Sequence, residues 1–520
     1  MSKQFRPYQD EASKAVLTAW RKKQNCLVAL ATGGGKTFIA ALTSARANSG
    51  GRILFLANRN ELCAQPMEVF TELLGYRPAL EKAESVAPLD AQVVIGSVQT
   101  LSRKKRLERF PADHFAYIFA DECHMSLAES WKRIFAHFPE AKRCGITATP
   151  FRTDNKPLTD LFEVEAYRKG IFQLVDEGYL VNPDHVDRLE TAISLAQVRV
   201  KRTAEGLDYD VNDAASAIEP YFAQIAKEIA KKHAFKKILA FLPLVATSQK
   251  FVLACRQAGI NAVHVDGQDL LRDQKLEAFR QGDIQLLSNS NLLHTGVDIP
   301  SCDTTLNLRP TRSKVLYQQI VGRSTRTEPG VIDGLDSVQR RLAAIACSSK
   351  PRAYILDPLW LSEDHDLVTP ASLIAQTEEE AEDMRAKAPR SYSLRALHSK
   401  VQADREEAIR RRLEATARFR EGKVSAQYFA AAAHDHALVN YRAVYKWETA
   451  PVGKFSRFLL EKAGIDPETV QGEGYARAVM RAVGRRRYRG LAEIRDLGGA
   501  AERQVADIWD LRTPEARRYN

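Results

Sequence analysis

Short apolar runs separated by longer amphipathic stretches dominate the first 360 residues of the chain. A helix is expected first, at 10–21, where apolar residues recur at helical spacing. The apolar runs that follow it lie at residues 26–31, 53–57, 93–97 and 117–120, and a further strand that closes with hydroxyls is expected at 144–150. Each run ends where polar residues begin, and the intervals are suited to helices. Buried strands that alternate with helices predict a parallel sheet, which binds ligands at its carboxyl edge.

A second alternating set of apolar runs predicts a second sheet. Its strands are expected at 237–242, 262–266, 284–288 and 353–357. From residue 384 onward the chain is rich in alanine and arginine and reads as helical, and acidic residues gather just before it. The predicted fold class is therefore α/β, with two tandem parallel-sheet lobes and an α-helical C-terminal domain. The expected boundaries are a first lobe at 1–168, an interlobe linker at 169–185, a second lobe at 186–358, an acidic linker at 359–390 and a basic helical accessory domain at 391–520.

Three consecutive glycines follow the first apolar run. Gly33, Gly34 and Gly35 precede Lys36 and Thr37, and the next residues can pack as a helix. Glycines let the backbone curl so that its N–H groups point at phosphate oxygens, and the helix N-terminus adds its positive dipole end. The lysine supplies a point charge, and the threonine hydroxyl is a ligand for Mg²⁺. The segment predicts a phosphate-binding loop; the plainer alternative is a glycine-rich turn without a ligand.

Two adjacent carboxylates, Asp121 and Glu122, end the run at 117–120. Beside a phosphate loop such a pair has a mechanical role, because one carboxylate holds Mg²⁺ through water while the other polarises the attacking water. We expect Asp121 to take the first role and Glu122 the second. An acidic turn at the end of a strand is the alternative.

Two arginines in the second lobe offer the complementary charge. Arg323 and Arg326 lie three residues apart, a spacing that shares one face of a helix. Phosphoryl transfer develops negative charge on the γ-phosphate oxygens, which planar guanidinium groups stabilise. Because Lys36 belongs to the other lobe, the arginines are expected to complete the site only when the lobes close. Taken alone, the pair reads as a solvated helix face.

Composition narrows the class of protein. The 520 residues include 45% hydrophobic and 27% charged residues, and no apolar run reaches the length of a membrane span. The N-terminus lacks the apolar core of a signal peptide, and the seven cysteines form no C-x-x-C pair. These features predict a cytoplasmic protein with free thiols and argue against a zinc ribbon. The net charge of +11 favours an anionic partner, most commonly nucleic acid.

The order of the polar segments resembles that of superfamily 2 DECH-box helicases and translocases. The matching segments are Gln9, 31–37, 121–124, 147–150, 294–300 and 317–326. The resemblance is nearest to the RadD, XPB and restriction-translocase group, and it covers residues 5 to 357. It implies two RecA-like lobes with ATP and Mg²⁺ between them.

The resemblance also implies roles for individual residues. Those implied to bind ATP are Gln9, Thr32, Gly33, Gly34, Gly35, Lys36, Thr37, Gly296 and Asp298, and those implied to hold Mg²⁺ are Thr37 and Asp121. Those implied to act on the γ-phosphate and the attacking water are Lys36, Glu122, Gln319, Arg323 and Arg326. Those implied to contact nucleic acid are Arg59, Ser97, Gln99, Thr100 and Thr295.

The densest charge of the tail surrounds Tyr488 and includes Arg485, Arg486 and Arg487. Such a cluster can neutralise phosphates while the tyrosine stacks on a base, although a basic solvated turn fits equally well. The expected activity is ATP-dependent translocation or unwinding, with DNA favoured as the partner and replication or repair as the setting. An RNA helicase and an ATP-gated clamp that does not travel are the alternatives. A protein partner of the C-terminal domain and the oligomeric state stay open.

Overall fold

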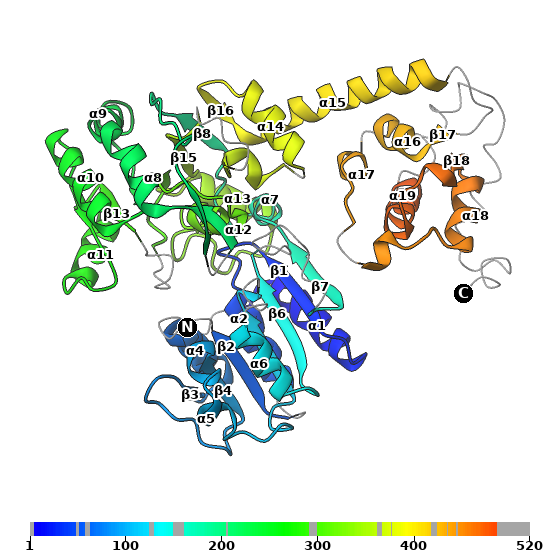
Figure 1. Ribbon diagram of the computed structural model, residues 1–520, viewed down its shortest axis with the longest axis horizontal. Coiled ribbons are helices and arrows are strands. Elements are labelled where there is room, and N and C mark those ends of the chain that lie inside the picture. Colours follow the sequence, from blue (N-terminus) through cyan, green and yellow to red (C-terminus); the bar gives the residue numbers. More distant parts are fainter. Residues whose placement is uncertain are drawn as a thin grey trace. The chain divides into compact units, whose positions relative to one another are not determined.

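The computed structural model, drawn in Figure 1, divides into two compact units. One comprises Met1–Ala375 with Arg385–Arg395, and the other Gln376–Met384 with Ala396–Asn520. Among the described residues, no helix is both long and apolar enough to cross a bilayer. The structure describes residues 5–47, 51–57, 63–123, 129–148, 161–203, 206–290, 299–360, 367–375, 377–417, 424–433, 435–443 and 446–485.

The first lobe is built on a seven-stranded sheet in which every pair of neighbours is parallel. The strand order is β3-β4-β2-β5-β6-β1-β7, and Figure 1 shows β7 beside β1. All residues of β1, β2 and β4 are buried, which explains their unbroken apolar sequences. The strands are β1 Cys26–Leu30, β2 Ile53–Ala57, β3 Ala79–Glu81, β4 Val93–Ser97, β5 Tyr117–Asp121, β6 Lys142–Thr147 and β7 Val164–Lys169.

Helices connect these strands. Helix α1 starts at Pro7, whose fixed backbone suits the first helical position, and it packs on α2, β1 and β7. Its Trp20 is buried and stacks on Tyr117, with ring centroids 4.5 Å apart. The helices are α1 Pro7–Arg21, α2 Lys36–Ala47, α3 Ala64–Leu74, α4 Val98–Leu101, α5 Lys104–Leu107 and α6 Glu129–His137.

The second lobe has its own seven-stranded sheet, in the order β12-β13-β11-β14-β15-β8-β16. Only β16 runs antiparallel to its neighbour among the described strand pairs of this sheet. A separate hairpin of β9 and β10 precedes its first long helices. The strands are β8 His185–Arg188, β9 Val200–Thr203, β10 Gly206–Tyr209, β11 Ile238–Phe241, β12 Ala262–His264, β13 Leu286–Asn289, β14 Thr304–Asn307, β15 Tyr354–Asp357 and β16 Ser391–Ser393.

Short helix α7, Ile171–Asp176, lies in the segment predicted to link the lobes. In the second lobe, α9 and α10 pack together and α10 lies against β12 and β13. The remaining helical elements of this lobe are α8 Val211–Ile218, η3 Glu219–Tyr221, α9 Phe222–Lys232, α10 Val245–Gln257, α11 Arg272–Gln281, α12 Lys314–Val321 and α13 Val338–Ala346. The parallel first sheet and the second sheet, which is parallel except for its edge strand β16, confirm the predicted α/β class with tandem lobes.

The second unit is mostly helical, as predicted, although β17 and β18 form a short parallel pair within it. Buried Phe429, Leu460 and Val479 contribute to its core. The chain from residue 370 onward contains η5 Pro370–Leu373, α14 Glu378–Lys387, α15 Leu394–Ala417, β17 Val424–Ser425, α16 Ala426–Ala432, α17 His436–Val439, η6 Lys446–Thr449, α18 Lys454–Lys462, β18 Ile465–Asp466, η7 Pro467–Thr469 and α19 Glu473–Arg485.

The acidic segment at 359–390 differs from the solvated linker expected from its charge. Helix α14 runs through it, and Glu380 on this helix is completely buried. The Glu380 carboxylate lies 2.9 Å from Nε2 of His398 and accepts a hydrogen bond from the side-chain amide of Gln402. In the sequence, a run of carboxylates predicts a solvated segment. The Glu380 carboxylate is buried instead, and its polar partners His398 and Gln402 compensate for that burial.

Candidate active site

The glycine loop follows β1 in a conformation that side chains would prevent. Gly33 and Gly35 have φ values of 85° and 84°, in the left-handed region that favours glycine. A Cβ atom at Gly34 would lie only 2.7 Å from Cγ of Leu30, and one at Gly35 would lie 2.4 Å from Nε2 of Gln9. The loop leads directly into α2, which begins at Lys36. This is the strand, loop and helix that a phosphate cradle requires.

Two residues of α1 stabilise the glycine loop by hydrogen bonds to its backbone. The Tyr8 hydroxyl donates to the carbonyl oxygen of Gly34 at 2.7 Å, and the Gln9 amide nitrogen donates to the same oxygen at 3.3 Å. The Gln9 side-chain oxygen accepts from the backbone N–H of Arg6 at 2.9 Å. Gln9 therefore supports the phosphate loop, and its expected reading of adenine stays a prediction. Sequence reasoning missed Tyr8, although it directly precedes Gln9.

Lys36 and Glu122 meet at the carboxyl edge of the first sheet. The Nζ atom of Lys36 lies 2.8 Å from Oε1 of Glu122, and the two side chains are 13% and 20% exposed. Glu122 has a φ of 49°, which is uncommon for a residue with a side chain. Its backbone N–H donates to Oδ1 of Asp121 at 3.1 Å. The structure thus brings the predicted phosphate-binding cation together with the predicted base.

Cys123 follows this pair and is buried next to Gly145 of β6. A Cβ atom at Gly145 would lie 2.8 Å from the Cys123 sulfur. Burial, followed by the nearby charges of Glu122 and Asp121, raises the pKa of the Cys123 thiol. The thiol therefore stays protonated and packs as an apolar group.

The residues expected to hold a metal have the donor chemistry that Mg²⁺ prefers. Thr37 offers a hydroxyl in the first turn of α2, and Asp121 ends β5 with a carboxylate. Among the described residues, no cluster of three or more His, Cys, Asp or Glu side chains forms a protein cage for a metal ion. Since Mg²⁺ is usually bound through one or two protein oxygens together with substrate phosphates and water, these two residues fit it.

The second lobe reaches the glycine loop through the segment that follows α12. A Cβ atom at Gly322 would lie 2.6 Å from Cβ of Thr32, so only glycine permits this approach. A Cβ atom at Gly33 would lie 3.3 Å from Cγ of Arg326. Residues of the two lobes therefore contact each other at the phosphate loop.

The two arginines do not share a helix face, contrary to the expectation from their spacing. Helix α12 ends at Val321, and Arg326 lies beyond a turn, in an isolated bridge with Leu180. The reason is local: the Ser324 hydroxyl donates to the carbonyl of Val321 at 2.9 Å, and that of Thr325 to the carbonyl of Gly322 at 3.1 Å. These bonds satisfy carbonyls at the helix end and stop its propagation. Gln319, Arg323 and Arg326 are each half-buried.

The interlobe segment connects this region to α1 and α13. The backbone N–H of Val181 donates to the carbonyl of Thr325 at 2.7 Å. The Tyr179 ring lies edge-on to the Tyr8 ring, with centroids 4.9 Å apart. The Arg341 guanidinium lies over the Tyr179 ring, 4.2 Å from the ring centroid. Arg341 is buried and donates through Nε to the carbonyl of Glu177 at 2.9 Å. Two tyrosines and an arginine thus link the phosphate loop to α13, and none of the three was predicted.

Two of the residues expected to contact nucleic acid are buried in the first lobe. Ser97 caps α4 by accepting from the backbone N–H of Thr100 at 3.2 Å, and its hydroxyl donates to that of Thr100 at 3.1 Å. The Thr100 hydroxyl accepts from the N–H of Ala83 at 2.9 Å. The Ser97 and Thr100 side chains thus stabilise the start of α4 and its contact with the loop after β3, whereas Gln99 between them is exposed.

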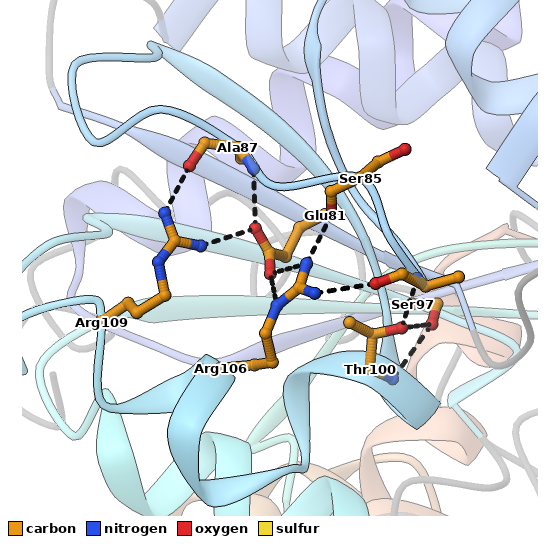
Figure 2. Close-up of polar contacts among 8 residues, drawn as sticks. Glu81, Ser85, Ala87, Ser97, Thr100, Arg106 and Arg109 are labelled. Carbon is orange, nitrogen blue, oxygen red and sulfur yellow. Dashed lines mark hydrogen bonds and ion pairs between the residues drawn. The ribbon is translucent and has the colours of Figure 1, made fainter.

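Figure 2 shows the network that surrounds them. Glu81, at the end of β3, is completely buried and accepts from the N–H of Ala87 at 2.8 Å, from Arg106, and from Arg109 at 3.2 Å. Arg106 also donates to the carbonyl of Ser85. The two arginines compensate for the buried carboxylate and fix the loop after β3 to α5.

The other predicted site residues lie at or beyond the limits of the described chain. Arg485 is the last residue of α19, and its side chain is outside the description. The predicted residues that fall outside the described ranges are Arg59, Thr295, Gly296, Asp298, Arg486 and Arg487. Their expected roles stay predictions.

Comparisons with known proteins agree with this architecture. Residues 2–152 match the family model "Type III restriction enzyme, res subunit", and residues 221–328 match "Helicase conserved C-terminal domain". The chain is 28% identical to the putative ATP-dependent helicase IRC3 of Saccharomyces cerevisiae over 62% of its length and 49% of that protein. It is 30% identical to the putative mitochondrial ATP-dependent helicase irc3 of Schizosaccharomyces pombe, over 65% of this chain and 58% of the relative.

A solved fragment of a putative HsdR subunit of a type I restriction enzyme from Vibrio vulnificus shares the fold. Its TM-score is 0.50 at 24% identity, over 68% of this chain and 64% of that one. The chain spans only about half to three-fifths of the two yeast proteins. The two family models fall on the two lobes, one on the glycine loop and DECH segment and the other on α12 and the arginines. The two lobes are therefore similar to the domains of ATP-dependent helicases and of restriction-enzyme subunits.

Proposed function

We propose that this protein is a nucleic-acid-stimulated ATPase that moves along or unwinds DNA. The observation that carries the proposal is the approach of Arg326 in the second lobe to Gly33 in the phosphate loop of the first. ATP bound at that loop would be enclosed by groups from both lobes. Binding and hydrolysis would then change how firmly the lobes hold each other.

Each residue of the site has a proposed part in this cycle. The backbone N–H groups of the glycine loop and the Lys36 ammonium bind the phosphates, while Thr37 and Asp121 hold Mg²⁺ when it is bound, which neutralises charge on the phosphates. Lys36, which is paired with Glu122, would turn to the phosphates and release that carboxylate to orient the attacking water. Arg326, with Arg323 and Gln319, would stabilise the charge that develops on the γ-phosphate.

The nucleic acid would lie against the carboxyl edge of the first lobe near α4. Gln99 is exposed there, and Arg103, Lys104 and Lys105 are exposed just after it. Arg133 of α6 joins this group, because its guanidinium donates to the carbonyl of Ser102 at 3.0 Å. Such a surface attracts phosphates with little sequence preference, and its affinity would fall steeply with salt.

DNA is favoured over RNA because the family model and the HsdR fragment are both described as parts of restriction enzymes. An RNA helicase and an ATP-gated clamp that does not travel are the competing functions. We also propose a cytoplasmic location, because all seven cysteines are free thiols, as in a reducing compartment.

Two assays separate these functions. The first measures the ATPase rate with single-stranded, duplex, forked and four-way DNA and with the matching RNAs; we expect DNA to stimulate the rate more than RNA does. The second measures displacement of a third strand from a DNA triplex in the presence of ATP. Displacement supports a translocase, whereas DNA-stimulated hydrolysis without displacement would support the clamp. Stronger stimulation by RNA would overturn the choice of DNA.

A further inference from the structure

Lys350 is a buried lysine in the loop between α13 and β15. Its side chain ends between two backbone carbonyls, and Nζ donates to that of Pro300 at 2.7 Å and to that of Arg326 at 2.8 Å. Only 3% of the residue is exposed. A lysine is rarely buried to this extent, because removing an ammonium from water is costly unless its hydrogen bonds are replaced.

The two carbonyls belong to segments far apart in the sequence. Pro300 ends the segment 294–300, which precedes β14, and Arg326 is the residue that lies against Gly33. Backbone hydrogen bonds fix the loop that carries Lys350. The N–H of Lys350 donates to Oγ of Ser348 at 3.1 Å, and the N–H of Ala353 donates to the carbonyl of Asn182 at 2.9 Å. One ammonium therefore ties the backbone of Arg326 to the frame of the second lobe.

Charged and titratable groups also act on the ammonium. Asp303, Glu328 and Cys302 favour its charged form, and the Arg326 guanidinium disfavours it. Burial outweighs them and lowers the pKa of Lys350 to about 8. The Asp303 carboxylate itself accepts from the N–H of Lys237 at 3.0 Å and from the Thr304 hydroxyl at 2.7 Å.

We propose that Lys350 is a positioning residue that holds Arg326 against the phosphate loop and thereby supports ATP turnover. The proposal rests on the function proposed above. The Lys350 ammonium donates to the carbonyls of Pro300 and Arg326, so its effect on the phosphate loop passes through the backbone of Arg326. A charged ammonium makes stronger hydrogen bonds to the two carbonyls than a neutral amine does. The hydrogen bonds from Lys350 to the two carbonyls should therefore weaken when the ammonium loses a proton.

The test compares steady-state ATP hydrolysis by the full chain, saturated with duplex DNA, from pH 6.5 to 9.5. For Lys350→Met we expect kcat at pH 7 to fall at least tenfold while KM for ATP changes less than about threefold, since the first lobe keeps its phosphate loop. For the unaltered chain we expect kcat to fall above about pH 8. Lys350→Arg, which keeps its charge at every pH in this range, should lose that alkaline fall, and this variant decides the question if Lys350→Met does not fold.

The matched control is Lys237→Met. Lys237 also donates through Nζ to a backbone carbonyl, that of Arg280 at 3.1 Å, but at the surface. It should keep both kcat and the alkaline fall. If Lys350→Met retains the kcat and pH profile of the unaltered chain, the positioning role is overturned while the proposed function stands. If the unaltered chain shows no DNA-stimulated hydrolysis, it is the proposed function that fails.

Discussion

Arg326 of the second lobe packs against Gly33 of the first, so close that a Cβ atom at Gly33 would lie 3.3 Å from its Cγ. The same Cβ would lie 3.1 Å from Cδ2 of Leu180, the residue that forms a bridge with Arg326. Gly33 is therefore the point where the phosphate loop contacts both Leu180 of the interlobe segment and Arg326 of the second lobe. A substitution in one of these three segments should therefore displace residues of the other two.

Gly33→Ala tests this meeting point. The substitution places a side chain at a φ of 85°, which costs on the order of 1 kcal/mol, and also pushes on Leu180 and Arg326. Gly75→Ala is the matched control, because Gly75 has a φ of 76° and nothing within 4 Å of the added atom. In thermal unfolding we expect Gly75→Ala to show the backbone cost alone and Gly33→Ala to lose somewhat more stability, but only Gly33→Ala to lose ATPase activity, by at least tenfold. Equal activity of the two variants would show that the contact is not needed.

Glu122→Gln separates nucleotide binding from hydrolysis. The amide keeps the shape of the carboxylate and its place beside Lys36 but cannot accept a proton from water. We expect hydrolysis to fall by roughly 10²- to 10⁴-fold, the usual contribution of a general base, while affinity for an ATP analogue is retained. Hydrolysis at the original rate would mean that another residue orients the water.

Lys36→Ala removes the cation of the phosphate loop and leaves Glu122 without the ammonium that lies 2.8 Å from it. We expect weaker nucleotide binding, measured by titration with a fluorescent ATP analogue, together with loss of hydrolysis. In the double variant Lys36→Ala/Glu122→Gln the negative charge at position 122 is also removed, so part of the binding loss should be recovered if that charge repels the phosphates. If Lys36→Ala and the double variant bind the ATP analogue equally weakly, the loss of binding comes from the missing Lys36 cation alone.

Arg341→Met tests the link between α13 and the interlobe segment. Arg341 is buried, donates to the carbonyls of Glu177 and Leu335, and stacks on Tyr179, so its loss should destabilise the chain by about 2–4 kcal/mol. The neighbouring Arg340 has a side chain that is 65% exposed, and Arg340→Met should change stability by less than about 0.5 kcal/mol. Chemical denaturation measures both. A similar midpoint for the two variants would contradict the structural role of Arg341.

Most of the strands that sequence reasoning found are buried on both faces. The predicted ranges for β2 and β4 agree with the structure to the residue, because their five positions are all apolar or small and all buried. In the first sheet the two edge strands were missed; in the second sheet the edge strand β12 was predicted, whereas the buried central strand β14 was not. Strand β7 reads Val-Glu-Ala-Tyr-Arg-Lys and is only half-buried, and β3 is three residues long and ends in Glu81, which reads as a loop until its two arginine partners are seen.

The candidate site divides in the same way. The glycine loop, Lys36 and the carboxylates could be predicted because each is a short contiguous pattern with a chemical reason. Tyr8, Tyr179, Arg341 and Lys350 carry no such pattern, since their partners lie in distant parts of the chain. The placement of Arg326 was expected from the resemblance, whereas its helical setting was wrong because the hydroxyls of Ser324 and Thr325 end α12 early.

The most direct test of a site shared by two lobes is the DNA-stimulated ATPase rate of Arg326→Ala beside that of the unaltered chain, with ATP-analogue affinity measured in parallel. The shared site predicts that the variant binds the analogue but loses most of the DNA-stimulated rate, by about 10³-fold or more, as when an arginine finger is removed. A variant that hydrolyses ATP at the original rate would show that the second lobe contributes nothing to the chemistry.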